Sequence, residues 1–250
     1  MRHEGGEQDV KSAAQRALVA ASVVAALGLT AACGGNGGGD DAKASSKESS
    51  QSKETAAAEA GAKALTAAQL DKAVVTSAEL KGYKIEKMSG ADMPSEIVPA
   101  DPAECQPLAD MFMFSTQPKA QARIGRTLTG PNELDATVTS LALLAHEQAD
   151  AEKIMAGLRT ATEKCTGYEH ADYEYSGVEA LDAPDAGDEA VSYKVTGDID
   201  GDKVPMAFTV VRSSSTIVSF YAINMLDAKK VEVPAEVVDA QLAKLEKVAG

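Results

Sequence analysis

Residues 173–225 read YEYSGVEALD APDAGDEAVS YKVTGDIDGD KVPMAFTVVR SSSTIVSFYA INM and form the longest part of the chain with strand character. Aromatic and β-branched residues occur in short runs that are separated by clusters of Gly, Pro, Asp and Ser. This pattern is typical of strands joined by short turns. It predicts four strands, at residues 173–181, 190–196, 205–212 and 216–225.

A short acidic segment, Asp-Ile-Asp-Gly-Asp at 198–202, separates the second of these strands from the third. An EF-hand calcium loop requires Gly at position six and Glu at position twelve, where this chain has Lys203 and Thr209. We therefore predict a polar hairpin turn. Weak calcium affinity stays open, because eleven acidic residues and one lysine lie between Glu169 and Asp202.

The sequence before and after this region alternates between helix and strand patterns. Thr66, with Gln69 three residues later, predicts a helix start with a capping box. Asp101 as N-cap, followed by Pro102 and Glu104, predicts another helix start. The expected strands are 82–88, 122–128 and 134–143, with a turn at 130–132, and the expected helices are 66–75, one from 101, 150–164 and one from 234.

Helices that flank a run of antiparallel strands indicate an α+β fold, with a mainly antiparallel sheet packed with helices. We expect a single domain at residues 64–250. The chain carries 24 Lys and Arg against 38 Asp and Glu, a formal net charge of −14. This excess argues against nucleic acid as a partner, because phosphates are neutralised by clustered basic residues. It also argues against electrostatic docking on an anionic membrane.

The N-terminal part has the pattern of an export signal. Residues 17–32 contain no charge and follow Lys11 and Arg16, which is typical of the apolar region of a signal peptide and too short for a membrane span. Small residues then lead to Cys33, and Leu-Thr-Ala-Ala-Cys at 29–33 resembles the lipobox of bacterial lipoproteins. The resemblance implies cleavage between Ala32 and Cys33 and a diacylglyceryl thioether on Cys33. The alternative is an ordinary secretory signal with an incidental cysteine.

A lipidated Cys33 would hold the protein on the extracytoplasmic face of the cell membrane, since two or more acyl chains anchor stably. Residues 33–63 contain mainly Gly, Ser, Ala, Lys, Glu and Asp. Such a composition cannot bury enough apolar surface to fold, so we expect a disordered tether. The signal peptide would then be residues 1–32, and the membrane would be a partner through the lipid anchor alone.

With Cys33 assigned to lipid, Cys105 and Cys165 remain. Both lie on predicted helices, and export would place them in an oxidising compartment. We predict that they form a disulfide between the first turn of one helix and the last turn of the other. Two free thiols, or a metal pair without further ligands, are the alternatives.

The order of these elements is similar to that of the extracellular sensor domain of mycobacterial serine/threonine kinases, which actinobacterial lipoproteins also carry. The residues that carry the resemblance are Ala103-Glu104-Cys105, Ala151, Leu158, Cys165 and Lys244-Leu245. The resemblance implies a non-catalytic module with a ligand cleft between helices and sheet. We expect no cofactor, since no glycine-rich phosphate loop precedes a helix in the domain.

The candidate ligand contacts are apolar and aromatic, because apolar pockets often use such side chains and Met adapts to the shape of a ligand. Core packing is the alternative for all of them. The candidates are Met111, Phe112, Met113, Phe114, Tyr173 and Tyr175, of which Tyr173 and Tyr175 share one face of a strand.

Catalysis has little support in the sequence. Only His146 and His170 follow Cys33, and we expect both to be solvated. No Gly-x-Ser-x-Gly is present, and the two domain cysteines are expected to be paired. The leading hypothesis is a sensor-like domain for a small apolar ligand. The alternative is a protein-interaction or envelope-structural module with an envelope protein as partner, and a hydrolase ranks third.

Overall fold

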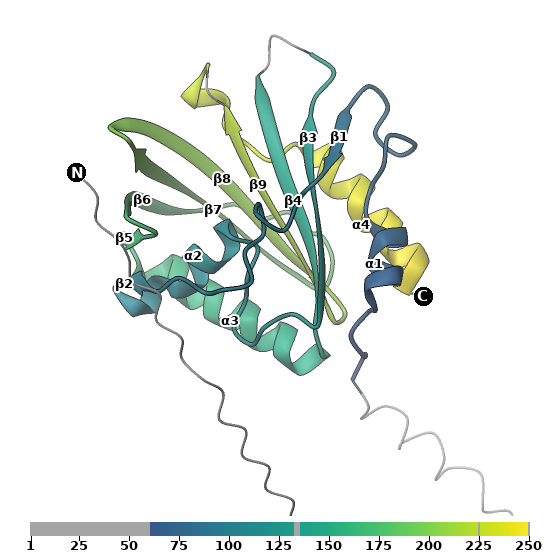
Figure 1. Cartoon of the computed structure of the whole chain (residues 1–250). Helices are drawn as coiled ribbons and strands as arrows, with labels where there is room; N and C mark the ends of the chain where they lie inside the picture. Colours follow the sequence, from purple (N-terminus) through teal and green to yellow (C-terminus); the bar gives the residue numbers. More distant parts are fainter. Residues whose placement is uncertain (1–60, 133–135, 225, 250) are drawn as a thin grey trace, which may run out of the picture. The chain divides into compact units, whose positions relative to one another are not determined.

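The computed structural model describes residues 61–132, 136–224 and 226–249. Within them one sheet of nine strands runs in the order β1-β3-β4-β9-β8-β7-β6-β5-β2 (Figure 1), and every neighbouring pair is antiparallel. The strands are β1 (Lys84–Lys87), β2 (Ala100–Asp101), β3 (Ala122–Thr129), β4 (Thr137–Ala145), β5 (Gly167–His170), β6 (Tyr173–Leu181), β7 (Glu189–Ile199), β8 (Asp202–Ser213) and β9 (Thr216–Asn224).

Helices cover both faces of this sheet (Figure 1). Leu108 of α2 and Met155 of α3 belong to a buried cluster with Tyr193 of the sheet. Leu70 of α1 and Leu242 of α4 belong to a second buried cluster, with sheet residues that include Phe220. The helices are α1 (Ala67–Ala73), α2 (Gln106–Phe112), α3 (Gln148–Lys164) and α4 (Ala235–Ala249), with 3₁₀ turns η1 (Ala103–Cys105) and η2 (Ala228–Lys230).

The two faces of the sheet receive different side chains, because successive residues of a strand point to opposite sides. On β7, Tyr193 packs under α2 and α3, while its neighbour Ser192 faces the other way and pairs with Thr209 of β8. Tyr193 and Phe208 therefore pack on the α2–α3 side, and the smaller Ser192, Ala207 and Thr209 line the α4 side.

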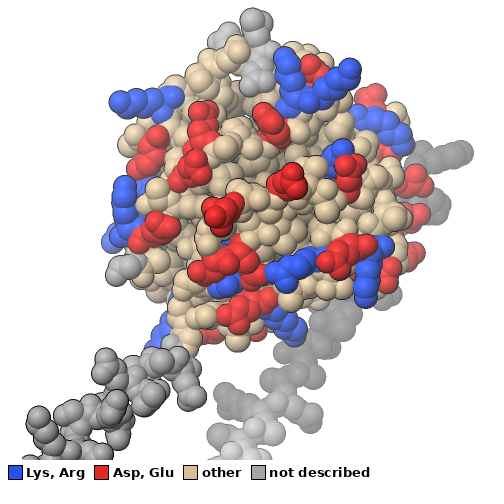
Figure 2. Space-filling model, turned by 180° about the vertical axis from the view of Figure 1, so that it is seen from behind, with Lys and Arg blue, Asp and Glu red and all other residues tan. Residues whose placement is uncertain are grey.

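The predicted α+β architecture is confirmed, and so are the predicted strands and helices within the described residues, apart from the helix start at Asp101. Thr66 and Gln69 form the expected capping box at α1. β7 and β8 join through a hairpin at Asp200 and Gly201, which have φ angles of 54° and 89°. On the face in Figure 2, acidic side chains are spread widely, and basic ones lie mostly nearer its margins.

One predicted helix start is wrong. Asp101 is not an N-cap, because it pairs with Glu169 at the edge of the sheet as part of β2. Pro102 instead precedes the 3₁₀ turn η1, and α2 begins only at Gln106. The expected signal peptide, Cys33 and most of the expected tether lie outside the described residues. Within the described residues, no helix is long and apolar enough to cross a membrane.

Candidate functional site

A disulfide joins the two helices that lie on one face of the sheet. Cys105, at the end of η1, bonds to Cys165, the C-cap residue of α3, with their Cα atoms 5.7 Å apart. The predicted pairing is therefore confirmed. The bridge fixes the start of α2 against the end of α3, since α2 follows directly after Cys105.

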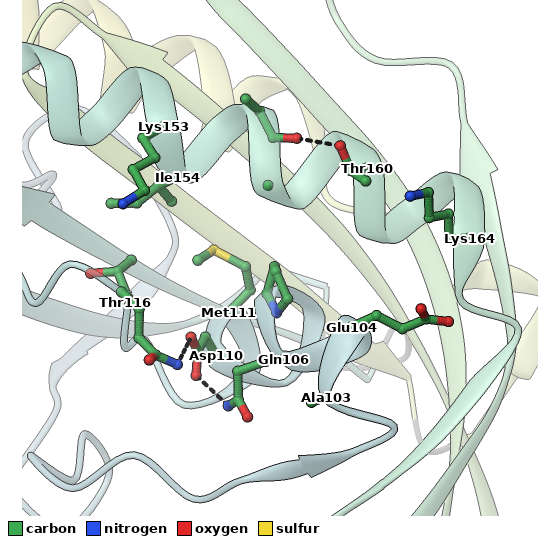
Figure 3. A pocket seen from close by; sticks show the side chains of 14 residues that line it. Ala103, Glu104, Gln106, Asp110, Met111, Thr116, Lys153, Ile154, Thr160 and Lys164 are labelled. Atoms are coloured by element: carbon green, nitrogen blue, oxygen red, sulfur yellow. Dashed lines mark hydrogen bonds between the residues drawn. The ribbon is translucent and has the colours of Figure 1, made fainter.

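A groove with a volume of about 840 Å³ lies between these helices. We call it the α2–α3 groove; Figure 3 shows its lining residues. Met111 and Pro107 of α2 face Ile154 and Gly157 of α3 across it. The volume lies within the range of small-molecule sites, and the apolar walls suit an apolar ligand.

The most unusual residue of the groove is Asp110, a carboxylate that is only 4% exposed. Gln106 Nε2 donates to its Oδ1 over 2.7 Å, and Gln117 Nε2 donates to its Oδ2 over 3.2 Å (Figure 3). Burial raises the pKa of Asp110 despite these hydrogen bonds. The Gln106 amide is itself fixed, because its Oε1 accepts from the Ala100 backbone N–H and its Nε2 also donates to the Val98 carbonyl.

Two lysines mark the α3 side of the groove. Lys153 and Lys164 are eleven residues apart, which places them about 16 Å apart along the helix axis. Neither forms an ion pair with another described residue. Glu104 lies on the α2 side near the Lys164 end (Figure 3). Charged side chains therefore lie at well-separated positions along the groove.

Of the six predicted ligand residues, Met111 lines this groove. The aromatic ones pack between α2 and the sheet instead. Phe112 lies 5.4 Å from Tyr221 and 6.0 Å from Tyr175, measured between ring centroids, and Phe114 stacks on Tyr221. Met111, Phe114 and Tyr175 are buried, and Phe112, Met113 and Tyr173 are partly buried. Their role in ligand binding stays a prediction.

The expectation that both histidines are solvated is wrong. His146 is 1% exposed and His170 is 3% exposed. His146 directly follows β4 and His170 ends β5, so the sheet and its helices cover both rings. Neither position belongs to a periodic pattern that would have revealed this burial.

The two buried histidine rings form few hydrogen bonds with described residues. His146 Nε2 lies 3.3 Å from Thr116 Oγ1, and burial lowers the pKa of His146 to about 4. His170 Nδ1 has no hydrogen-bond partner among the described residues, and burial lowers its pKa too, against the opposing charge of Asp110. Thr116 is 2% exposed, so the Thr116–His146 pair does not present a reactive hydroxyl to solvent.

Sequence reasoning missed the polar part of the groove, namely Gln106, Asp110 and Gln117. The four-residue spacing of Gln106 and Asp110 was a usable signal, because such a pair shares one helix face and hydrogen-bonds there. Gln117 follows α2 in the connection to β3, where no periodicity indicates its direction. Its contact with Asp110 is therefore visible only in the folded chain.

Comparisons with known proteins gave no family model and no curated protein that matches this chain. Two of the solved structures that resemble it come from mycobacteria. The extracellular domain of PknH from Mycobacterium tuberculosis is 10% identical, with a TM-score of 0.49, over 75% of this chain and 100% of that one. A putative uncharacterized protein, the Rv0999 ortholog from Mycobacterium smegmatis, is 12% identical, with a TM-score of 0.40, over 74% of this chain and 95% of that one.

Proposed function

We propose that this chain is an extracytoplasmic lipoprotein, anchored through Cys33, whose folded domain binds a small ligand in the α2–α3 groove without transforming it. The observation that carries the proposal is Asp110, a buried carboxyl group in the wall of the α2–α3 groove, close to the apolar side chains of Met111 and Ile154. Burying a carboxylate costs free energy unless hydrogen bonds compensate for it. Such a group is therefore well suited to recognise a ligand.

The hydrogen bonds of Asp110 indicate the kind of ligand. Each oxygen accepts from one glutamine amide, and a carboxylate offers about four acceptor positions. The remaining positions suit a donor, such as a hydroxyl, amide or ammonium group. Met111 and Ile154 would contact the rest of the molecule. The proposed ligand is therefore an apolar molecule with one hydrogen-bond-donating group.

The extracytoplasmic location is supported by two independent features. The signal-like residues 17–33 end in a lipobox-like cysteine. The Cys105–Cys165 disulfide is typical of proteins that fold outside the reducing cytosol.

A binding role without catalysis is supported by the chemistry of the groove. Cys105 and Cys165, which join the two helices of the groove, form a disulfide, so neither offers a nucleophilic thiolate. Asp110 is tied to two amides that would hold it in one orientation.

The test is native mass spectrometry of the full chain, released from its own membrane in mild detergent. We expect a bound mass beyond the lipid anchor, and we expect Asp110→Asn to lose it, because Asn replaces one acceptor oxygen with a donor. Glu163→Gln, an exposed change on the same helix pair, is the matched control and should keep the bound mass. Equal retention by Asp110→Asn would refute the role of this groove.

A further inference from the structure

A second cavity, of about 290 Å³, lies beside the first turns of α4, on the face of the sheet opposite the α2–α3 groove. We call it the α4 hollow. Its floor is formed by small side chains, Ser192 of β7 with Ala207 and Thr209 of β8. The two hydroxyls lie 3.1 Å apart and bond to each other. The two hydroxyls of the floor are therefore already each other's hydrogen-bond partners.

The walls of the α4 hollow carry apolar side chains. Val233 and Val238 lie on the α4 side, Leu181 is the last residue of β6, and Pro184 lies on the β6–β7 connection. Leu181 is 39% exposed and is one of only two large hydrophobic side chains that are exposed in the described part of the chain. Leu181 therefore adds accessible apolar surface at the edge of the hollow, where the aliphatic part of a bound side chain could contact it.

The charge around this hollow has one sign. Asp182, Glu232 and Asp239 all line it, and all three are exposed. Its described lining contains no Lys, Arg or His. None of the three acids forms an ion pair with a described residue. The α2–α3 groove differs, because Lys153 and Lys164 contribute to its lining.

We propose that the α4 hollow is a docking site for an arginine side chain of a basic polypeptide partner. Its volume falls just below the range of about 300–1,000 Å³ for small-molecule sites, so it suits one long side chain. The aliphatic stem would contact Val238 and Leu181, and the guanidinium would reach the acids at the rim. A planar guanidinium binds carboxylates through paired hydrogen bonds, which favours arginine over lysine.

The overall charge favours the same partner. The chain has a formal net charge of −14, and a field of one sign attracts oppositely charged proteins and speeds their association. This site is independent of the ligand proposed for the α2–α3 groove, because the two lie on opposite faces of the sheet. Failure of one proposal therefore leaves the other standing.

The test uses the full chain in mild detergent and a fluorescein-labelled peptide, Gly-Leu-Arg-Leu-Gly, with binding followed by anisotropy. The comparison peptide carries citrulline, a neutral isostere of arginine. We expect the arginine peptide to bind at least about tenfold more tightly than the citrulline peptide. Asp239→Asn and Glu232→Gln should each weaken it about three- to tenfold, as expected for charge-assisted hydrogen bonds.

Two further variants separate the site from the general charge of the protein. Ala235 is exposed and lines the hollow, so Ala235→Trp should fill it and abolish binding without loading the core. Glu246→Gln, farther along α4, removes one charge away from the hollow and should leave binding unchanged. The proposal is overturned if the arginine and citrulline peptides bind equally tightly, or if neither binds at a concentration of about 1 mM. It is also overturned if the Ala235→Trp variant still binds the arginine peptide, or if Glu246→Gln weakens binding as much as Asp239→Asn does.

Discussion

Removal of the Cys105–Cys165 disulfide should destabilise the domain by several kcal/mol. The bridged residues are 60 apart in the sequence. For a closed loop of this length, the chain-entropy model predicts a contribution of about 4 kcal/mol at 25 °C. The double variant Cys105→Ala, Cys165→Ala removes the bridge without burying hydroxyl groups at two positions that are at most 4% exposed.

Urea unfolding at 25 °C measures the effect. With a slope of about 2 kcal/mol per molar urea, a loss of about 4 kcal/mol lowers the unfolding midpoint by about 2 M. Wild-type protein in dithiothreitol is the control for lost side-chain volume. It should unfold close to the double variant, and the double variant should not respond to dithiothreitol. A loss below about 1 kcal/mol in both samples would refute the view that the bridge is a main constraint on α2 and α3.

Three other perturbations have definite expected outcomes. Acidification from pH 6.5 to pH 4 should destabilise the domain, because burial lowers the pKa of His146 in the folded protein to about 4, so that mainly the unfolded chain binds this proton in that range. His146 should contribute up to about 3 kcal/mol of the lost stability. The urea midpoint of His146→Gln should therefore fall less steeply with decreasing pH than that of the wild type. Gly187→Ala should lower the free energy of unfolding by more than about 2 kcal/mol, because the added Cβ would lie 2.4 Å from the Arg212 carbonyl oxygen at a φ of 64°. The control Gly177→Ala has a similar φ of 66° but open space around the added Cβ, so it should lower the free energy by about 1 kcal/mol. Equal losses in the two variants would contradict the predicted clash at Gly187. Cys33→Ser should move the protein from the membrane fraction to the soluble or secreted fraction of its cells, and retention in the membrane would exclude a thioether anchor.

The long elements were predictable because their patterns are local. The alternation in β6–β9 and the apolar face of α3, which includes Ile154 and Leu158, are repeated often enough to specify type and extent. The short edge strands β2 and β5 were missed, because two and four residues are too few for a periodicity. The same omission produced the wrong role for Asp101, which pairs with β5.

The candidate site was less predictable than the fold. Met111 was identified from its residue type, and the disulfide followed from the cysteine count. Asp110 was not identified, because its burial depends on how α2 meets α3 and on Gln117, which reaches it from a connecting segment. The aromatic candidates Phe112 and Tyr175 were chosen for their chemistry, but their arrangement around Tyr221 arises only when α2 packs on the sheet.

The most direct measurement is a crystal structure of the full chain purified from its own membrane with its bound molecules retained. The account predicts non-protein density in the α2–α3 groove, with a donor atom within about 3.2 Å of an Asp110 carboxyl oxygen and an apolar body against Met111 and Ile154. A bound molecule seated elsewhere, for example against Phe112 and Tyr221, together with an empty groove would contradict it.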